Sequence, residues 1–435
     1  MALRLDTRDP GFAAAFRALV EARRAVDEDV DAAVAAIISD VRAHGDAALL
    51  AATARFDRLT VPSAADLRVD AGVLRDARTR CGNEALAALE FAAKRIEDYH
   101  RCQMPADHAE TDDKGVRLGW RWTPVDSVGL YVPGGTAAYP SSVLMNAIPA
   151  RVAGVDRLVI AVPSPDGALN PLVLAAAAIA GVDEVWRIGG AQAIAALAYG
   201  TESIAPVDKI VGPGNAYVAA AKRRVFGTVG IDMVAGPSEI LVVADSENDP
   251  EWIAADLLSQ AEHDASAQAI LIADDAAFAD AVEQAVERRL VTLPRGEIAR
   301  ASWRAHGAVI VMGDLMDAGA LVDRLAPEHL ELAVSDPGSL AARIRHAGAI
   351  FLGRFTPEAV GDYVAGPSHV LPTSRSARFS SGLGVLDFLK RTSLVGCDRS
   401  GLGAIGPAAV TLAREEGLDT HALSVSIRLG ALDEG

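Results

Sequence analysis

The chain has 435 residues, of which 51% are hydrophobic, so it can build about two to four domains with sizeable cores. Its formal net charge is −17, from 41 basic and 58 acidic residues, which argues against nucleic acid or an anionic membrane surface as the main partner. The amino terminus lacks the apolar segment of a signal peptide, and the longest apolar run, at 172–182, is too short to cross a bilayer. Three cysteines without CxxC spacing argue against a disulfide framework and fit a reducing compartment. We therefore expect a cytoplasmic protein.

The first part of the chain is predicted to be helical over residues 1–110, because apolar residues recur there at three- and four-residue spacing. Gly45 is predicted to end one of these helices. Between 125 and 245, Ala-rich helical stretches alternate with short apolar runs: SVGLYV, RLVIAV, EVWRI, DKIVG and EILVVA. A second alternating region spans 267–353, and about the last fifty residues have little apolar face of their own. This order predicts an α/β fold with parallel sheets covered on both faces, and a carboxy-terminal tail that docks on another surface.

Three glycine-rich turns follow predicted strands and open helices, at positions 131, 188 and 211. Glycine lets the backbone approach a ligand, and the free N–H groups of a helix amino terminus favour phosphate. None of the turns has the GxGxxG spacing of a Rossmann fingerprint, since Tyr217 stands where the third glycine would follow Gly212 and Gly214. The turns indicate either ordinary strand–helix connections or a dinucleotide cleft, for which the candidate side-chain donors are Tyr131, Gln192 and Asn215.

The segment LLSQAEHDASAQA, residues 257–269, has the pattern of a half-buried helix in which Gln260 and His263 are three residues apart. Side chains at that spacing share a helix face and can converge on one point, such as a metal ion. A solvated or hydrogen-bonded helix surface would give the same pattern, so this segment alone leaves both interpretations open.

Two later segments add candidates for the same site. FTPEAVGDYVAGPSHVLPT holds Asp362 and His369 among glycines and prolines, where a rigid, apolar loop indicates an arranged site. In AREEGLDTHALSVS, one helix is predicted to end and another to begin near Asp419, which leaves Glu416 and His421 at the junction. Together the segments supply Gln, two His and Asp, an oxygen and nitrogen set that suits zinc or a similar divalent ion.

The segment RLAPEHLELAV places Glu328 beside His329, just after Pro327. Adjacent residues of a regular element point apart, so the two can act together only at a bend, which Pro327 favours. Histidine and glutamate are the commonest proton-transfer side chains near neutral pH. The two residues are therefore a candidate acid–base pair, with an exposed loop pair as the alternative.

The chain resembles the histidinol dehydrogenase family from about residue 5 to 430. The resemblance rests on eight motifs in the family's order and spacing: YVPGG, GGAQAIAALAYGT, VGPGNAYV, AGPSEILVVAD, LLSQAEHD, PEHLEL, GDYVAGPSHVLPT and EGLDTHALS. It implies two incomplete Rossmann-like parallel-sheet domains, a helical amino-terminal region and a small carboxy-terminal dimerisation tail. The expected domains are 1–128 together with 238–381, 129–237 for NAD binding, and 382–435 as a tail that docks on the partner subunit.

The resemblance also implies an activity, the zinc-dependent oxidation of L-histidinol to L-histidine with two NAD+ reduced, in the last steps of histidine biosynthesis. Carried over residue by residue, it assigns one zinc ion per subunit to Gln260, His263, Asp362 and His421. It makes Glu328 and His329 the acid–base pair, and it lines the NAD+ site with Tyr131, Gln192 and Asn215. The substrate would contact Ser238, Gln260, His263, His329, Asp362, Glu416 and His421. The implied assembly is a homodimer with shared active sites.

Other protein classes share parts of this pattern. A related branch of the superfamily, similar in fold and metal site, oxidises sulfonated diols, but Glu416 suits an amino group and argues against that substrate. A zinc hydrolase would use the same ligands and would leave the three glycine-rich turns without a role. A non-enzymatic binding protein would not need Glu328 beside His329.

Overall fold

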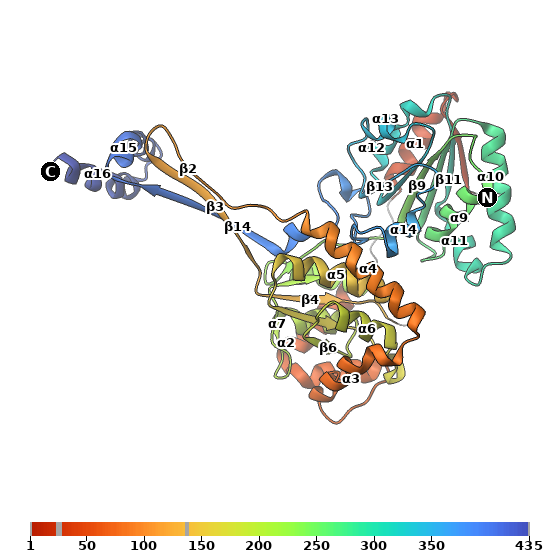
Figure 1. Cartoon of the computed structure of the whole chain (residues 1–435), viewed down its shortest axis with the longest axis horizontal. Coiled ribbons are helices and arrows are strands. Elements are labelled where there is room, and N and C mark those ends of the chain that lie inside the picture. The colour runs from red at the N-terminus through yellow and green to blue at the C-terminus, as the bar shows by residue number, and fades with distance from the viewer. Residues whose placement is uncertain (1, 23–27, 135–138, 434–435) are drawn as a thin grey trace.

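The computed structural model describes residues 2–22, 28–134 and 139–433 (Figure 1). Two α/β lobes, each built on a parallel sheet, lie next to each other, and a long arm projects from them (Figure 1). The predicted α/β class with parallel sheets is therefore confirmed. Within the described ranges, no helix is long and apolar enough to cross a membrane.

One lobe is built on a six-stranded sheet with the order β1-β11-β10-β9-β12-β13, in which all neighbours are parallel. Its strands are β1 (Leu3–Asp6), β9 (Glu239–Ala244), β10 (Gln268–Ala273), β11 (Ala308–Val311), β12 (His329–Ala333) and β13 (Ala349–Leu352). One face of this sheet is covered by α9 (Pro250–Ala261), α10 (Ala276–Leu290) and α11 (Gly296–His306). The other face is covered by α1 (Phe12–Glu21), α12 (Gly319–Leu325) and α13 (Pro337–Ala341). Because both faces are covered, the central strands are continuous apolar runs.

The other lobe is built on a five-stranded parallel sheet with the order β6-β5-β4-β7-β8. Its strands are β4 (Ser127–Tyr131), β5 (Arg157–Ala161), β6 (Glu184–Trp186), β7 (Lys209–Val211) and β8 (Gly230–Ile231). One face is covered by α2 (Glu28–Phe56), α7 (Gly190–Tyr199) and α8 (Ala216–Val225), and the other by α3 (Ala71–Asp76), α4 (Asn83–Arg101), α5 (Pro140–Ala153) and α6 (Pro171–Ile179). The strand order reverses between β4 and β7, and ligands of open α/β sheets bind at the carboxyl ends of such strands.

The arm is an antiparallel ribbon of β2 (His108–Thr111), β3 (Val116–Pro124) and β14 (Leu389–Cys397). At its far end lie α15 (Arg399–Glu415) and α16 (Asp419–Asp433), away from both lobes (Figure 1). Gly417 adopts φ +72° between the two helices, so the break predicted near Asp419 is confirmed. The arm therefore holds α15 and α16 away from both lobes, where they are accessible to another molecule.

The structure differs from the sequence predictions at several elements. Leu3–Asp6 are not helical, because they pair with β11 as an edge strand. At Gly45 the helix α2 breaks, with φ +49°, but resumes at once because the carboxylate of Glu202 accepts a hydrogen bond from the N–H of Asp46 at 2.8 Å. The run EILVVA is β9 of the six-stranded sheet, whereas the four runs before it belong to the five-stranded sheet. The division of the chain into domains stays a prediction.

Short elements complete the fold: α14 (Glu358–Tyr363) and 3-10 turns at Ala64–Leu67, Ala77–Arg80, Pro165–Gly167, Leu315–Asp317, Ser376–Arg378 and Val385–Phe388.

Candidate active site

Glu328 and His329 lie at the amino end of β12, and the backbone of Glu239 at the start of β9 holds both side chains. The N–H of Glu239 donates to Oε2 of Glu328 at 2.9 Å, and its carbonyl oxygen lies 3.0 Å from Nδ1 of His329. Because a carbonyl only accepts hydrogen bonds, we assign the imidazole proton to Nδ1, which leaves a lone pair on Nε2. Both residues are buried, at 7% and 4% exposure, and Nδ1 lies 3.6 Å from Oε2 of Glu328. The two residues predicted from the sequence are therefore brought together.

Burial determines the protonation of this pair. It lowers the pKa of His329 to about 4, so the imidazole is neutral at pH 7. Burial also raises the pKa of Glu328 well above its ordinary value, and the nearby carboxyls of Glu239, Asp362 and Glu358 add to the effect. A neutral imidazole with a free lone pair can accept a proton, and a carboxylate with a raised pKa is a stronger base than free glutamate.

Two carboxyl groups of α14 face the free nitrogen of His329. Oε1 of Glu358 lies 3.7 Å and Oδ1 of Asp362 lies 3.9 Å from Nε2 of the imidazole. One ligand atom from each of the three residues lies within 4.8 Å of the other two, close enough to hold a metal ion. Burial, followed by the neighbouring Glu358, raises the pKa of Asp362 to about 8. Oε1 of Glu358 has no hydrogen-bond partner, so a cation beside it would satisfy a buried polar atom that is otherwise unpaired. Nε2 of His329 has no hydrogen-bond partner either, and its lone pair is free.

Gln260 and His263 lie at the end of α9, where the hydroxyl of the neighbouring Ser259 donates to Oε2 of Glu358 at 3.1 Å. Gln260 lies in the last helical turn at 1% exposure, and its Oε1 has no hydrogen-bond partner. Because α9 ends at Ala261, His263 lies in the turn after the helix, and the predicted shared helix face is wrong. The imidazole of His263 lies close enough to add to the effect of burial in lowering the pKa of His329. The carboxyl end of α9 is also the negative end of its dipole, which favours a cation.

His369 links the cluster to the other lobe. Its Nδ1–H donates to the backbone carbonyl of Asp362 at 3.0 Å, and its Nε2 lies 3.3 Å from the hydroxyl of Ser142, in the first turn of α5. Burial, followed by the neighbouring histidines, lowers the pKa of His369 to about 4. Ser238 is half-buried and directly precedes Glu239 at the same sheet edge. The site therefore lies between the amino edge of the six-stranded sheet and the helix that follows β4.

Further buried carboxyls lie beside the cluster. Burial raises the pKa of Asp256 to about 7, and the nearby Glu358 adds to this. Burial also raises the pKa of Glu331 to about 9, with Asp256 as the next cause. Several buried acids cannot ionise side by side without a compensating cation. The amide, imidazole and carboxylate donors gathered here therefore fit a bound zinc ion.

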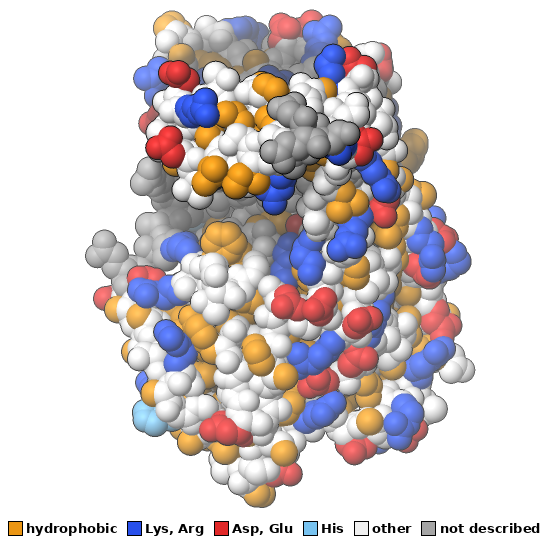
Figure 2. Space-filling model, turned by 90° about the vertical axis from the view of Figure 1, so that its left-hand side faces the viewer, with side chains coloured by type: hydrophobic (Ala, Val, Ile, Leu, Met, Phe, Trp, Pro, Cys, Tyr) orange, Lys and Arg blue, Asp and Glu red, His pale blue; other side chains and the backbone are white. Residues whose placement is uncertain are grey.

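Glu416 and His421 are not brought to this cluster within one chain. Both are exposed, and they lie at the junction of α15 and α16 at the end of the arm (Figure 1). In Figure 2, where this end faces the viewer, apolar side chains gather among charged ones on its surface. The exposed apolar residues of the two helices and of the turn between them include Leu412, Leu418, Leu423 and Ile427. Exposed apolar patches of this kind are typical of surfaces that bind other protein chains.

Tyr131, Gln192 and Asn215 lie at the carboxyl edge of the five-stranded sheet. Tyr131 ends β4, and its hydroxyl accepts a hydrogen bond from the N–H of Gly190 at 3.1 Å. Gln192 is buried, and its amide nitrogen has no hydrogen-bond partner. Asn215 caps α8 through its side-chain oxygen and is exposed, so its amide nitrogen is not used in the cap. The three residues flank the place where the strand order reverses, although residues 135–138 of the first turn lie outside the described residues.

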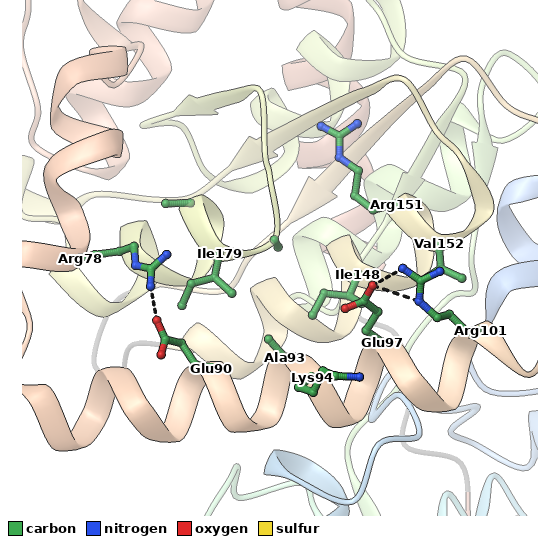
Figure 3. Close-up of a pocket in the computed structure, with 12 residues that line it drawn as sticks. Arg78, Glu90, Ala93, Lys94, Glu97, Arg101, Ile148, Arg151, Val152 and Ile179 are labelled. Atoms are coloured by element: carbon green, nitrogen blue, oxygen red, sulfur yellow. Dashed lines mark hydrogen bonds and ion pairs between the residues drawn. The ribbon is translucent and has the colours of Figure 1, made fainter.

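A separate hollow lies between α4, α5 and α6 (Figure 3). Its floor is apolar, and charged side chains line its rim. The rim charges pair with one another, Arg78 with Glu90 and Arg101 with Glu97 (Figure 3). The other two cations that line the hollow, Lys94 and Arg151, pair with Asp98 and Asp183. None of the predicted site residues lines this hollow.

Sequence reasoning missed Glu358, Glu239 and Ser142. The four-residue spacing between Glu358 and Asp362 is a usable signal, since such residues share a helix face. Glu239 holds its neighbours through its backbone, which the residue type does not reveal. Ser142 meets His369 only through the packing of the two lobes, across 227 positions of sequence.

Comparison with known proteins identifies the family. The profile of the histidinol dehydrogenase family matches residues 20–429. The chain is 67% identical over 430 residues to the histidinol dehydrogenase of Rhodospirillum rubrum, with 99% of each chain covered. It is 62% identical over 435 residues to that of Rhizobium meliloti, with 100% of each chain covered. The crystal structure of histidinol dehydrogenase from Elizabethkingia anophelis matches with a TM-score of 0.94, at 35% identity over 99% of each chain. The chain therefore belongs to the histidinol dehydrogenase family, as its motifs predict.

Proposed function

We propose that this chain oxidises L-histidinol to L-histidine through the aldehyde, with one zinc ion per subunit and two NAD+ reduced. Membership of the histidinol dehydrogenase family supports the reaction and its place in histidine biosynthesis. The observation that carries the mechanism is the free Nε2 of His329, which faces the carboxyls of Glu358 and Asp362. The three cysteines are all free, which suits a reducing compartment such as the cytoplasm.

Gln260, His263 and Asp362 of one chain would hold the zinc ion, and His421 of the partner subunit would complete the set. The unpaired oxygen of Gln260 and the buried carboxyl of Asp362 support two of these positions. His421 is exposed at the end of the arm, so it is available to another chain. Zinc, when bound, orients the substrate and stabilises negative charge on its oxygen.

NAD+ would lie at the carboxyl ends of β4 and β7, beside Tyr131, Gln192 and Asn215. The unpaired amide nitrogen of Gln192 supports a polar ligand at this edge. The amino terminus of α8, which begins here, favours a pyrophosphate group. NAD+, when bound, accepts the hydride of each oxidation.

His329 takes the proton of the first oxidation. The carbinol carbon loses a hydride readily only when its hydroxyl loses a proton, and the neutral Nε2 accepts that proton. The carbonyl of Glu239 stabilises the resulting imidazolium through its hydrogen bond to Nδ1. The alcohol has then lost one hydride and one proton and has become an aldehyde.

Glu328 serves the second oxidation. The aldehyde must add water before it can lose a second hydride, and Glu328 takes a proton from that water as it attacks. The hydrate then loses a hydride from carbon and a proton from oxygen, which gives the carboxylic acid. A site enclosed between two lobes would keep the aldehyde from side reactions.

A homodimer with shared sites would complete the substrate pocket. Glu416 and His421 of the partner subunit would contact L-histidinol, together with the site residues of the lobes: Ser238, Gln260, His263, His329 and Asp362. The exposed apolar residues of α15 and α16 support such a partner.

The reaction is tested by its stoichiometry. Zinc-loaded protein is incubated with limiting L-histidinol and excess NAD+, and NADH is measured by its absorbance. We expect two NADH per histidinol, with little aldehyde trapped by semicarbazide. A ratio of one would contradict the two-step proposal, and faster oxidation of a sulfonated diol than of histidinol would assign the chain another substrate.

A further inference from the structure

A buried ion pair lies beneath the turn that follows β7. Lys222 of α8 contacts Asp232, and their side chains are only 3% and 1% exposed. Desolvation of two charges largely offsets their attraction, so a buried ion pair contributes little net stability. Its place under the edge that would bind a dinucleotide suggests a role other than stability.

Both partners of the pair hold the backbone of the same residue, Gly212, through the two peptide groups on either side of its Cα. Nζ of Lys222 donates to the carbonyl of Gly212 at 3.0 Å, and the N–H of Gly212 donates to Oδ2 of Asp232 at 2.8 Å. Asp232 also accepts a hydrogen bond from the N–H of Met233 at 2.6 Å. The two polar groups of Gly212 are therefore fixed by opposite ends of one ion pair.

The residue that the pair fixes, Gly212, has no room for a side chain. Gly212 has φ +109°, and a Cβ there would collide with the backbone carbonyl of Tyr131 at the end of β4. Three residues later, the side-chain oxygen of Asn215 accepts from two N–H groups in the first turn of α8. Lys222 lies two turns further along the same helix, so it ties α8 back to the turn that precedes it.

We propose that Lys222 and Asp232 are a positioning pair that holds the turn 212–215 in the shape that receives the pyrophosphate of a dinucleotide. The ammonium group of Lys222 is buried and bonded to Asp232 and Gly212, so it braces the turn and does not contact phosphate. This inference rests on the proposed NAD+ site at the ends of β4 and β7.

The test removes both charges at once, because removal of one would leave the other buried and unpaired. In the double variant Lys222→Met/Asp232→Asn, the Kd for NAD+ is expected to rise about 5- to 30-fold, the ratio that corresponds to ordering the backbone of one residue on binding. Zinc content, the Kd for histidinol and kcat at saturating NAD+ should stay unchanged. The dissociation constants are measured by titration calorimetry.

A matched control lies in the same sheet. Arg157 and Glu184 form an ion pair, with Nε and Oε1 2.9 Å apart, at the amino edge of the five-stranded sheet, opposite the proposed cofactor edge. The double variant Arg157→Met/Glu184→Gln should bind NAD+ with the wild-type Kd. An equal rise in both double variants would mean general softening of the lobe and would overturn the positioning role.

The remaining outcomes distinguish a failure of the positioning role from a failure of the proposed NAD+ site. Wild-type Kd in Lys222→Met/Asp232→Asn, together with weaker binding in Asn215→Ala, would overturn the positioning pair alone. No binding by the wild-type protein, or unchanged binding in Asn215→Ala, would overturn the NAD+ site. If the double variant does not fold, Asp232→Glu decides, because it keeps both charges of the pair but moves the carboxylate that accepts from the N–H of Gly212: a raised Kd supports the proposal and a wild-type Kd overturns it.

Discussion

The carbonyl oxygen of Glu239 lies 3.0 Å from Nδ1 of His329 and fixes which nitrogen of the imidazole carries the proton. Protonation at Nδ1 leaves the lone pair of Nε2 directed toward the carboxyls of Glu358 and Asp362. The backbone of β9 thus orients the proposed base, whatever the side chain at position 239.

The contact between Glu239 and His329 can be tested by replacing His329 with each of the two amide residues, Asn and Gln. In His329→Asn the amide can still donate to the carbonyl of Glu239, but no base remains, so kcat should fall about 10²- to 10⁴-fold with zinc content unchanged. In His329→Gln the amide lies nearer the former Nε2 and loses the bond to Glu239, so the melting temperature should fall as well. Steady-state kinetics and thermal unfolding measure both. Near-normal kcat in His329→Asn would move the base elsewhere.

The second prediction concerns the metal. Gln260 and His263 come from the end of α9 and Asp362 from α14, so one ion would join remote segments. His263→Ala should lose bound zinc and activity while circular dichroism shows a folded protein. His44→Ala, which alters an exposed histidine of α2, should keep both. Full zinc occupancy in His263→Ala by elemental analysis would rule out this ligand.

The third prediction separates the two oxidations. Glu328→Gln should slow oxidation of added L-histidinaldehyde more than oxidation of L-histidinol to the aldehyde, because only the second step needs an activated water. Single-turnover formation of NADH with each substrate gives the two rates. Equal slowing of both steps would remove Glu328 from that role.

The fourth prediction concerns the shared site. His421→Ala and Glu328→Ala subunits, each inactive alone, are mixed and allowed to re-associate. In a mixed dimer, the intact lobes of one chain meet the intact arm of the other, so one site of two is restored. Random pairing makes roughly half the dimers mixed, and about a quarter of wild-type activity should return. No recovery after complete subunit exchange, shown by mass spectrometry, would mean that the arm serves its own chain.

The fifth prediction concerns His100, which is fully buried in α4 with Nδ1 2.8 Å from the carbonyl of Ile96. Burial lowers its pKa below the ordinary 6.5, so the unfolded chain binds this proton more readily than the folded one. His100 therefore costs no stability above 6.5, and stability falls as the pH drops toward the lowered pKa. The free energy of unfolding of the wild type minus that of His100→Gln should decrease by up to about 1.4 kcal/mol per pH unit below 6.5. Urea unfolding of both zinc-loaded proteins measures this difference, and parallel pH curves would contradict it.

The elements of the sheets were open to prediction because parallel strands buried on both faces must be continuous apolar runs. The sequence does not reveal to which of the two sheets each run belongs, since β9 follows β8 in sequence yet lies in the other lobe. That choice depends on contacts with β10 and β12, which come later in the chain.

The candidate site shows the same limit. Residue type and motif single out Gln260, His263, Asp362 and the pair Glu328 and His329, because their side chains are of types that can bind metal or transfer protons. The backbone of Glu239 and the hydroxyl of Ser142 have no such signature, because their contacts exist only once distant segments have packed.

The site lies between a sheet edge where strands begin, in the six-stranded sheet, and helices that start where strands end, in the five-stranded sheet. The carboxyl end of α9 and several buried acids face one side of the site, and the helices that begin at the carboxyl edge of the five-stranded sheet face the other. Peptide dipoles make the first side electrically negative and the second positive. Each proposed oxidation moves a hydride, and with it two electrons, from the first side to the second. The potential set by the backbone therefore favours hydride transfer in the direction of oxidation and opposes it in the direction of reduction.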